Sequence, residues 1–256
     1  MEIKNNNIIT DDNYFEDRDY ITSSMIKLAL EGSKKQFDYA MNNSIESEAF
    51  LVGSAFHAMM LEPDKFSELY AFEPAMDRRT KAGKEYIAEW QEENKHIPNH
   101  IPGKYESMLY NMQESLNNHP TYSELVIPDK GGREEILLFK HNNVKCKAKI
   151  DYYNDDYIVD IKTCNSVKTM DVVESIKKYL YHVQAAFYLK SKEEFKTFYF
   201  VFIEKKAPHD IIIINFKAGL EDGDKCIEAG INNILTFREP KIDIPIYAAF
   251  NEIVTI

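Results

Sequence analysis

The sequence contains few cysteines and no long apolar run, and each absence excludes a class of protein. Its 256 residues include three cysteines, Cys146, Cys164 and Cys226, and no C-x-x-C pair. A zinc knuckle, an iron–sulfur cluster held by four thiolates and a disulfide framework are therefore excluded. No stretch approaches the ~20 apolar residues that cross a bilayer. The polar, acidic start of the chain also contains no signal-peptide segment. We expect a soluble cytoplasmic protein with no membrane partner.

Positive charge is also in short supply. Lysine and arginine number 31 against 42 acidic residues, which gives a formal net charge of -11. This balance excludes a uniformly basic surface that binds phosphate wherever it touches nucleic acid. Hydrophobic residues make up 44% and aromatic residues 12% of the chain, so a sizeable core is expected and wholesale disorder is excluded. A nucleic-acid-binding protein of this composition needs locally concentrated positive charge or bound metal ions.

Two common enzyme motifs are missing. No P-loop G-x-x-x-x-G-K-[ST] is present, so ATP-driven helicase activity is not encoded. Ser54 is not part of a G-x-S-x-G elbow, which leaves a serine hydrolase unsupported.

The pattern of elements predicts an α/β domain with a helical addition at its N-terminus. An acidic arm is expected over 1–20 and a single domain over 21–256. Thr22 or Ser23 can cap a first helix, and a second helix over 47–62 should stop at Pro63. Further helices are expected over 77–94, 101–118, 169–179, 181–194 and 218–237. Strands are expected over 136–139, 144–153, 157–163, 198–203 and 211–216, the first three as an antiparallel meander.

The stretch KCKAKIDYYNDDYIVDIKT, residues 145–163, carries the chemistry. Asp160 and Lys162 are two apart on one strand and therefore project to the same face, and the hairpin can bring Asp151 beside them. Two carboxylates next to an ammonium suit metal-assisted hydrolysis of a phosphodiester. An Asp–Lys ion pair on a half-exposed strand is the structural alternative. The apolar neighbours Ile158, Val159 and Ile161 favour the first interpretation, because charged groups in such a strand need a partner or a metal.

Two further features point the same way. Gln184 and Tyr188 are four apart on the helix that follows the hairpin, so they share a face. His57 follows the small residues Gly53, Ser54 and Ala55, which allow close backbone approach to a crowded site. The alternatives are a packing tyrosine with an exposed glutamine, and a structural histidine.

Together these residues resemble the PD-(D/E)XK nuclease superfamily, and more narrowly its exodeoxyribonuclease VIII (RecE-type) branch of phage and prophage exonucleases. Three blocks carry the resemblance in family order: GSAFHAMMLEPDKF, CKAKID…IVDIKT and YHVQAAFYL. The implied fold is a restriction-endonuclease-like core, a central mixed sheet flanked by helices.

The resemblance also implies roles for single residues. The metal ligands would be His57, Asp151, Asp160 and the backbone carbonyl of Ile161, and Lys162 would be the catalytic lysine. The residues that position the site or contact DNA would be Gln184, Tyr188 and Ser54. A glutamate on the preceding strand often helps, and Glu134 and Glu135 both remain open. The proline of the superfamily motif is replaced by Ile150.

The implied activity is Mg²⁺-dependent degradation of one strand of linear double-stranded DNA, 5′→3′, which leaves a 3′ overhang for phage-type recombination. Mn²⁺ is expected to substitute for Mg²⁺. The family assembles as ring-shaped homo-oligomers and works with a single-strand annealing protein, in a bacterial cytoplasm. Two alternatives stay open: a structure-specific or restriction-type endonuclease on the same fold, and a catalytically inactive DNA-binding recombination protein. Ring size, partner and number of metals are not encoded in any pattern of this sequence.

The net charge gives one more expectation. Residues 140–168 contain six lysines against four acids, two of which are candidate metal ligands. We therefore expect charge segregation, with a basic, metal-charged channel inside an acidic exterior.

Overall fold

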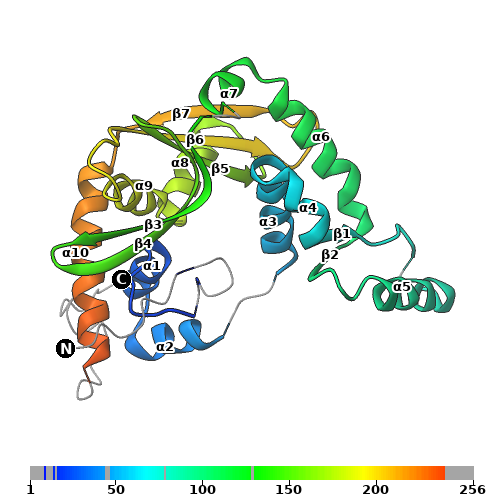
Figure 1. Ribbon diagram of the computed structural model, residues 1–256, viewed down its shortest axis with the longest axis horizontal. Helices are drawn as coiled ribbons and strands as arrows, with labels where there is room; N and C mark the ends of the chain where they lie inside the picture. The colour runs from blue at the N-terminus through cyan, green and yellow to red at the C-terminus, as the bar shows by residue number, and fades with distance from the viewer. Residues whose placement is uncertain are drawn as a thin grey trace, which may run out of the picture.

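Five strands form one central sheet in the computed structural model, in the spatial order β3-β4-β5-β6-β7 (Figure 1). They are β3 (Gly132–His141), β4 (Val144–Tyr153), β5 (Tyr157–Cys164), β6 (Thr197–Glu204) and β7 (Ile211–Phe216). The structure describes residues 9, 14, 16–43, 47–77, 79–127 and 130–239. Most of the expected acidic arm and the residues after 239 lie outside this range.

The sheet is mixed, as the sequence predicts. β3, β4 and β5 form the expected antiparallel meander, and β7 is antiparallel to β6. β5 and β6 are parallel, which requires a crossover between them. Helices α8 (Thr169–Lys178) and α9 (Tyr181–Leu189) supply that crossover.

The strands β4 and β5 diverge close to the turn that joins them. Their pairing is limited to Tyr152 with Val159 and Tyr153 with Ile158. Beyond these pairs, the side chain of Asp151 accepts a hydrogen bond of 2.7 Å from the backbone N–H of Ile161. A fork between two central strands therefore opens beside the polar residues that the sequence analysis singles out.

Each face of the sheet buries its own core, because successive side chains of a strand point to opposite faces. On β6, Phe198, Phe200 and Phe202 pack into one core, while Val201 and Ile203 pack into the other. Each fully buried side chain of this kind contributes roughly 1.5–3 kcal/mol. The first core is covered by α1 (Ser23–Glu31), α9 and α10 (Leu220–Arg238), and the second by α3 (Glu48–Leu61), α6 (Glu106–Asn117) and α7 (Pro120–Leu125).

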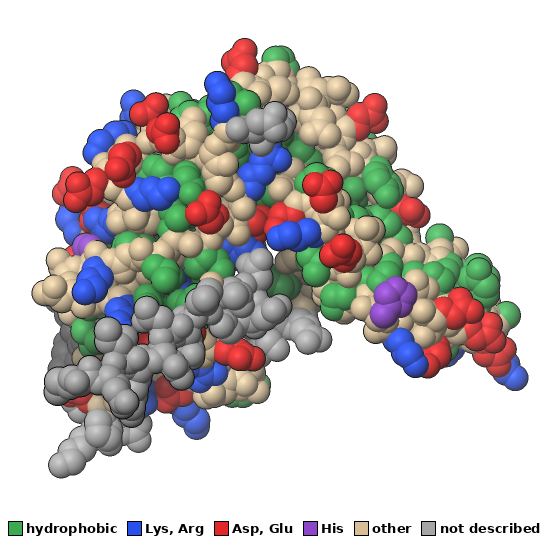
Figure 2. All heavy atoms as spheres, viewed as in Figure 1, with side chains coloured by type: hydrophobic (Ala, Val, Ile, Leu, Met, Phe, Trp, Pro, Cys, Tyr) green, Lys and Arg blue, Asp and Glu red, His purple; other side chains and the backbone are tan. Residues whose placement is uncertain are grey.

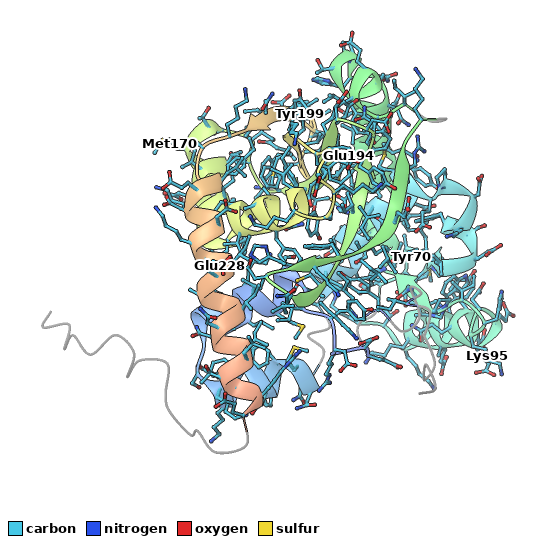
Figure 3. All side chains as sticks on the ribbon, turned by 60° about the vertical axis from the view of Figure 1, so that its left-hand side comes forward. Tyr70, Lys95, Met170, Glu194, Tyr199 and Glu228 are labelled. Atoms are coloured by element: carbon cyan, nitrogen blue, oxygen red, sulfur yellow. The ribbon has the colours of Figure 1, made fainter. Side chains whose placement is uncertain are left out.

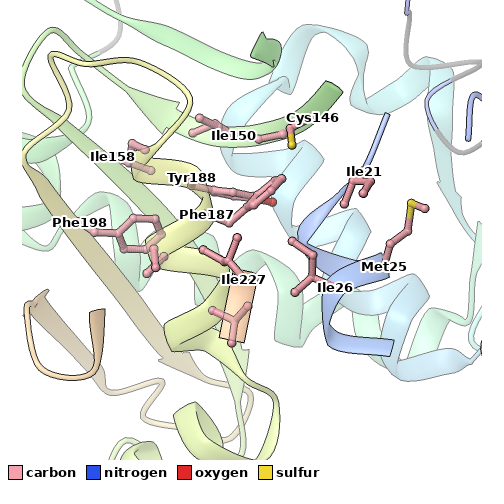
Figure 4. Packing of buried hydrophobic residues seen from close by; sticks show 14 of the residues in the cluster. Ile21, Met25, Ile26, Cys146, Ile150, Ile158, Phe187, Tyr188, Phe198 and Ile227 are labelled. Carbon is pink, nitrogen blue, oxygen red and sulfur yellow. The ribbon is translucent and has the colours of Figure 1, made fainter. Parts of the chain in front are cut away.

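Helix α1, the first helix of the N-terminal addition, packs into the domain core. Its residues Met25 and Ile26 pack with Phe187 and Tyr188 of α9 and with Ile227 of α10 (Figure 4). The Thr22 hydroxyl caps the helix by accepting a hydrogen bond from the N–H of residue 25, as expected. This packing holds the first turn of α1 beside the fork in the sheet.

The helical front contains more elements than the sequence predicts. Pro63 follows the end of α3, as expected, but it also begins α4 (Pro63–Leu69), because its fixed φ suits the first turn of a helix. Helix α2 (Lys34–Asn42), α7 and a parallel pair of short strands, β1 (Tyr70–Phe72) and β2 (Asn99–Ile101), were not predicted. A single 3-10 turn, Gly103–Tyr105, leads into α6.

Helix α5 (Lys81–Glu93) lies at the end of an extension away from the sheet (Figure 1). Figure 3 shows Lys95, at the end of this extension, and Glu228 of α10 at opposite sides of the molecule. Within the described residues, no helix is long and apolar enough to cross a membrane.

Candidate active site

A cavity of about 1030 Å³ opens at the fork between β4 and β5, between α1 and α3. Six of the predicted site residues line it: Ser54, His57, Asp151, Ile161, Lys162 and Tyr188. The other two, Asp160 and Gln184, are buried next to it and joined to each other by a hydrogen bond. Three segments far apart in the sequence therefore meet at one cavity.

His57, Glu134 and Asp151 form a compact group that suits a metal ion. One potential ligand atom from each of these residues lies within 4.8 Å of the other two. The Nδ1 of His57 is 3.5 Å from Oδ2 of Asp151 and 3.8 Å from Oε1 of Glu134. Imidazole nitrogen and carboxylate oxygen are ligands for divalent cations, so the donor set fits such an ion.

The hairpin explains why Glu134, and not Glu135, joins this group. The flanking pairs Arg133–Tyr152 and Glu135–Ile150 place Glu134 opposite Asp151, so both side chains share a face. Glu135 instead accepts a hydrogen bond from the Tyr153 hydroxyl on the exposed side. Glu134 adopts a φ of 47°, an uncommon conformation for a residue with a side chain and one that clusters at functional sites.

Asp160 and Lys162 form a second charged group on β5. The Lys162 Nζ lies 2.5 Å from Oδ2 of Asp160, and the Gln184 Nε2 donates a 2.7 Å hydrogen bond to Oδ1. Asp160 is completely buried. Apart from the close approach of the Lys162 ammonium, Oδ2 has no hydrogen-bond partner among the described residues. Glu134 joins the compact metal-suited group, and Asp160 lies outside it as a further candidate ligand.

Electrostatics favour the charged form of the histidine. Burial lowers the pKa of His57, but the Asp151 carboxylate and hydrogen bonds with Asp151 and Glu134 outweigh it and bring the pKa to about 10. Burial raises the pKa of Asp151, yet His57, Lys162 and the Ile161 N–H lower it below its usual value. A cation that binds these groups must therefore displace the histidine proton.

The second group responds differently to burial. Burial raises the pKa of Asp160 to about 6, against the opposing effect of Lys162. For Lys162 burial lowers the pKa, but Asp160 and Asp151 raise it above the usual value. Lys162 is therefore an ammonium at neutral pH, suited to holding negative charge and not to removing a proton.

Gly53 has a different role from the one expected. A methyl group added at its Cα would meet nothing closer than the Thr163 hydroxyl at 3.9 Å, so no backbone approaches closely there. Gly53 lines the cavity. Because glycine has no side chain, the cavity stays open at this position. The expectation that backbone approaches Gly53 closely was wrong.

The expected basic channel is absent from the described residues. The cavity is lined by three lysines, Lys65, Lys149 and Lys162, and by three acids, Glu62, Glu134 and Asp151. Of the other lysines in 140–168, Lys147 is buried and donates to the backbone oxygens of Tyr14 and Asp17. Figure 2 shows acidic and basic side chains interspersed over the visible face. Positive charge beyond this balance comes from the protonated His57 in the metal-free protein, and from a bound cation when one displaces the histidine proton.

Several residues at the cavity were not predicted. Lys149 forms an ion pair of 3.0 Å with Glu134, and Tyr181 lies under the ammonium of Lys162. The alternation of side chains on 144–153 places Lys149 on the face of Asp151, so this signal was present in the sequence. The position of Tyr70, which also lines the cavity, depends on the unpredicted strand β1.

The fold and this site define the PD-(D/E)XK class: a mixed sheet with an acidic residue on one strand and an Asp-x-Lys pair on the next. The model of one family, "PDDEXK-like domain of unknown function (DUF3799)", matches residues 22–243. The chain belongs to that family. The resemblance to the PD-(D/E)XK superfamily is thereby confirmed, while the RecE-type branch stays a prediction.

One solved structure shares the fold. A crystal structure of a "putative exonuclease" from Eubacterium rectale has a TM-score of 0.67 and 16% sequence identity, over 97% of this chain and 95% of that one. A structure of SSO0001 matches with a TM-score of 0.30 and 13% identity over 86% and 88% of the two chains, too low to carry an argument. A search of curated proteins gives no match.

Proposed function

We propose that this protein is a Mg²⁺-dependent exodeoxyribonuclease that degrades one strand of linear double-stranded DNA 5′→3′ and leaves a 3′ overhang. The carrying observation is that His57, Glu134 and Asp151 lie together in a cavity that Lys162 also lines. Membership in a PDDEXK-like family supports a nuclease. The direction, the duplex substrate and the link to recombination depend on the RecE-type resemblance alone.

The residues in and beside the cavity have distinct proposed roles. His57, Glu134 and Asp151 would hold the cation, with Asp160 and the Ile161 carbonyl as further candidate ligands. The cation supplies Lewis-acid activation of the phosphodiester and of water. Lys162, charged at neutral pH, binds the reacting phosphate and stabilises the negative charge that develops on it. Gln184 and Tyr188 position the site, and Ser54 contacts the DNA from α3.

DNA binding by this acidic protein depends on positive charge at the cavity. The lining lysines and acids balance, and the protonated His57 adds one positive charge; a divalent cation that displaces the histidine proton makes the cavity more positive still. We expect DNA binding to require the metal, and Mn²⁺ to substitute for Mg²⁺. A ring-shaped homo-oligomer and a single-strand annealing partner accompany the proposal through the resemblance.

The test uses linear duplex DNA labelled at the 5′ or the 3′ end, and covalently closed circular DNA, each with Mg²⁺ and with EDTA. The proposal predicts early release of the 5′ label, a 3′-labelled strand that shortens while it retains its label, and no reaction on circles or in EDTA. Cutting of closed circles would favour the endonuclease alternative. Binding of linear DNA without hydrolysis in Mg²⁺ or Mn²⁺ would favour the inactive DNA-binding alternative.

A matched set of variants assigns the activity to this site. Lys162→Ala removes the ammonium that lines the cavity, while Lys178→Ala removes a lysine of α8 that does not line it. Hydrolysis should be lost in the first variant and kept in the second. Equal hydrolysis by both variants would show that the activity belongs to another site.

A further inference from the structure

Lys27 of α1 is a second ammonium near the cavity, and the proposed function gives it no role. Ser23 and Ser24 line the cavity, and they precede Lys27 by four and three positions on the helix. Residues with this spacing share a helix face. Lys27 therefore lies on the side of α1 that faces the site, one turn further along.

The ring of Tyr181 connects this lysine with the catalytic candidate. The Nζ of Lys27 lies 5.8 Å from the centroid of the ring, and the Nζ of Lys162 lies 5.0 Å from the same centroid. Tyr181 itself lines the cavity. One aromatic side chain from α9 is thus flanked by two ammonium groups, one from α1 and one from β5.

This group carries an excess of positive charge. Lys162 contacts the Asp160 carboxylate, whereas Lys27 forms no ion pair with an acidic side chain anywhere in the described part of the chain. Asp160 and Glu31 favour its charged form, but burial and Lys162 outweigh them. Burial first, and then the nearby Lys162, lower the pKa of Lys27 to about 8. Two partly buried ammonium groups with one carboxylate are stabilised by an added anion.

We propose that Lys27 forms a second phosphate subsite, which binds a backbone phosphate of the substrate next to the scissile phosphate, with the Tyr181 ring fixing the spacing between the two ammonium groups. This inference rests on the proposed nuclease function and identifies the part of the substrate that α1 contacts. Lysine binds phosphate as a point charge, without the planar geometry that arginine imposes. A subsite of this kind contacts every DNA sequence equally.

The subsite gives a function to the side of α1 that faces the cavity. Ser23 and Ser24 line the cavity, and Lys27 lies one turn further along the same helix face with its ammonium over the Tyr181 ring. A phosphate bound there orients the strand relative to Lys162. Lys27 is therefore a binding and positioning residue for the substrate and takes no part in the transfer of protons.

The test combines a variant of the protein with a variant of the DNA. Wild type, Lys27→Met, Lys27→Arg and Lys178→Met are compared on linear duplexes that carry one neutral methylphosphonate linkage near the scissile bond, moved along the strand. Lys178 is a matched control, because its Nζ also lies over a tyrosine ring, that of Tyr179 at 5.3 Å, but Tyr179, unlike Tyr181, does not line the cavity.

The proposal predicts a coupling at one linkage. In wild type, the neutral linkage at that position should lower kcat/KM about tenfold, the loss of one charged phosphate contact. For Lys27→Met, kcat/KM on ordinary DNA should be about tenfold lower than for wild type, and the neutral linkage at that position should lower it no further. For this variant, the slope of log KM against the logarithm of the salt concentration should be smaller by about one. Lys27→Arg should retain most of the activity, and Lys178→Met all of it.

A purely structural role for Lys27 has a different signature. The variant would then unfold at lower temperature, and a neutral linkage would lower kcat/KM by the same factor in wild type and in Lys27→Met at every position. That result would overturn the subsite while leaving the nuclease intact. Failure of wild type to hydrolyse ordinary linear DNA would overturn the proposed function, and the subsite with it.

Discussion

The Nε2 of Gln184 donates a hydrogen bond of 2.7 Å to Oδ1 of Asp160 and so joins helix α9 to the buried carboxylate of β5. The other oxygen of Asp160 contacts the ammonium of Lys162. Gln184 is itself buried and does not line the cavity. Its geometry is that of a residue that orients Asp160, while contact with DNA falls to its neighbours.

Gln184→Leu should raise the pKa of Asp160 further above its usual value, because the charged carboxylate loses a hydrogen-bond donor. The acid limb of the pH–rate profile should then move to higher pH, and the free energy of unfolding should fall by about 1–3 kcal/mol. Urea unfolding and a pH series of hydrolysis rates measure both effects. Gln113→Leu, which removes a 3.1 Å bond to the Met59 carbonyl, is the control. It should lower stability without moving the profile; an unmoved profile in Gln184→Leu would contradict the role.

His57 should make the stability of the metal-free protein depend on pH. Its pKa of about 10 in the folded protein lies above the usual 6.5, so its contribution is complete below pH 6.5 and disappears as the pH rises through about 10. The difference in free energy of unfolding between wild type and His57→Gln should therefore shrink by at least ~1.4 kcal/mol over this window. Denaturant unfolding in EDTA measures it. A difference that does not change between these pH values would show that the imidazole is not held by Asp151 and Glu134.

Lys162→Met should lower kcat by about 10²–10³ and change KM much less, because the ammonium is expected to act on charge that develops during reaction. Since its pKa lies above the usual value, Lys162 remains charged throughout the neutral range. The rate should therefore show no deprotonation of Lys162 between pH 7 and pH 9. Steady-state hydrolysis by wild type, Lys162→Met and Lys162→Arg provides the comparison, and a loss confined to KM would assign Lys162 to substrate binding alone.

Gly53→Ala should stabilise the protein by about 0.5–1 kcal/mol, because alanine is the better helix former and the added methyl group meets no close neighbour. Gly53→Leu should instead place a side chain in the cavity that Gly53 lines. Its hydrolysis of DNA should fall while its melting temperature stays at or above that of wild type. Unfolding curves and hydrolysis rates of both variants decide this; full activity in Gly53→Leu would show that substrate does not occupy this part of the cavity.

The hairpin and the residues near it could be predicted because their signals are local. Alternation along 144–153 and 157–163 places Asp151, Asp160 and Lys162, and a short turn fixes how these strands pair. A two-residue turn at Asn142-Asn143 favours Glu134 over Glu135, since the pairing then places Glu134 opposite Asp151. Without that turn length, the sequence leaves both glutamates open.

Other features could not be predicted, because they depend on packing between distant segments. Lys27 reaches the site only because α1 packs on α9 and α10, a contact that no local pattern reports. The expectation of a basic channel was wrong for the same reason. Lys147 belongs to the lysine-rich stretch, but its buried ammonium donates hydrogen bonds to the backbone oxygens of residues 14 and 17. Composition gives the number of charged side chains but not the direction in which each one points.

The central claim is that Asp151 and its neighbours form a metal-dependent nuclease site. The most direct measurement is the rate of hydrolysis of linear duplex DNA in Mg²⁺ by wild type, Asp151→Asn and Glu135→Gln, the last as an acid that lies beside the group but outside it. The account predicts equal rates for wild type and Glu135→Gln, and a rate for Asp151→Asn that is lower by about 10² or more. Hydrolysis by Asp151→Asn at the wild-type rate would contradict it.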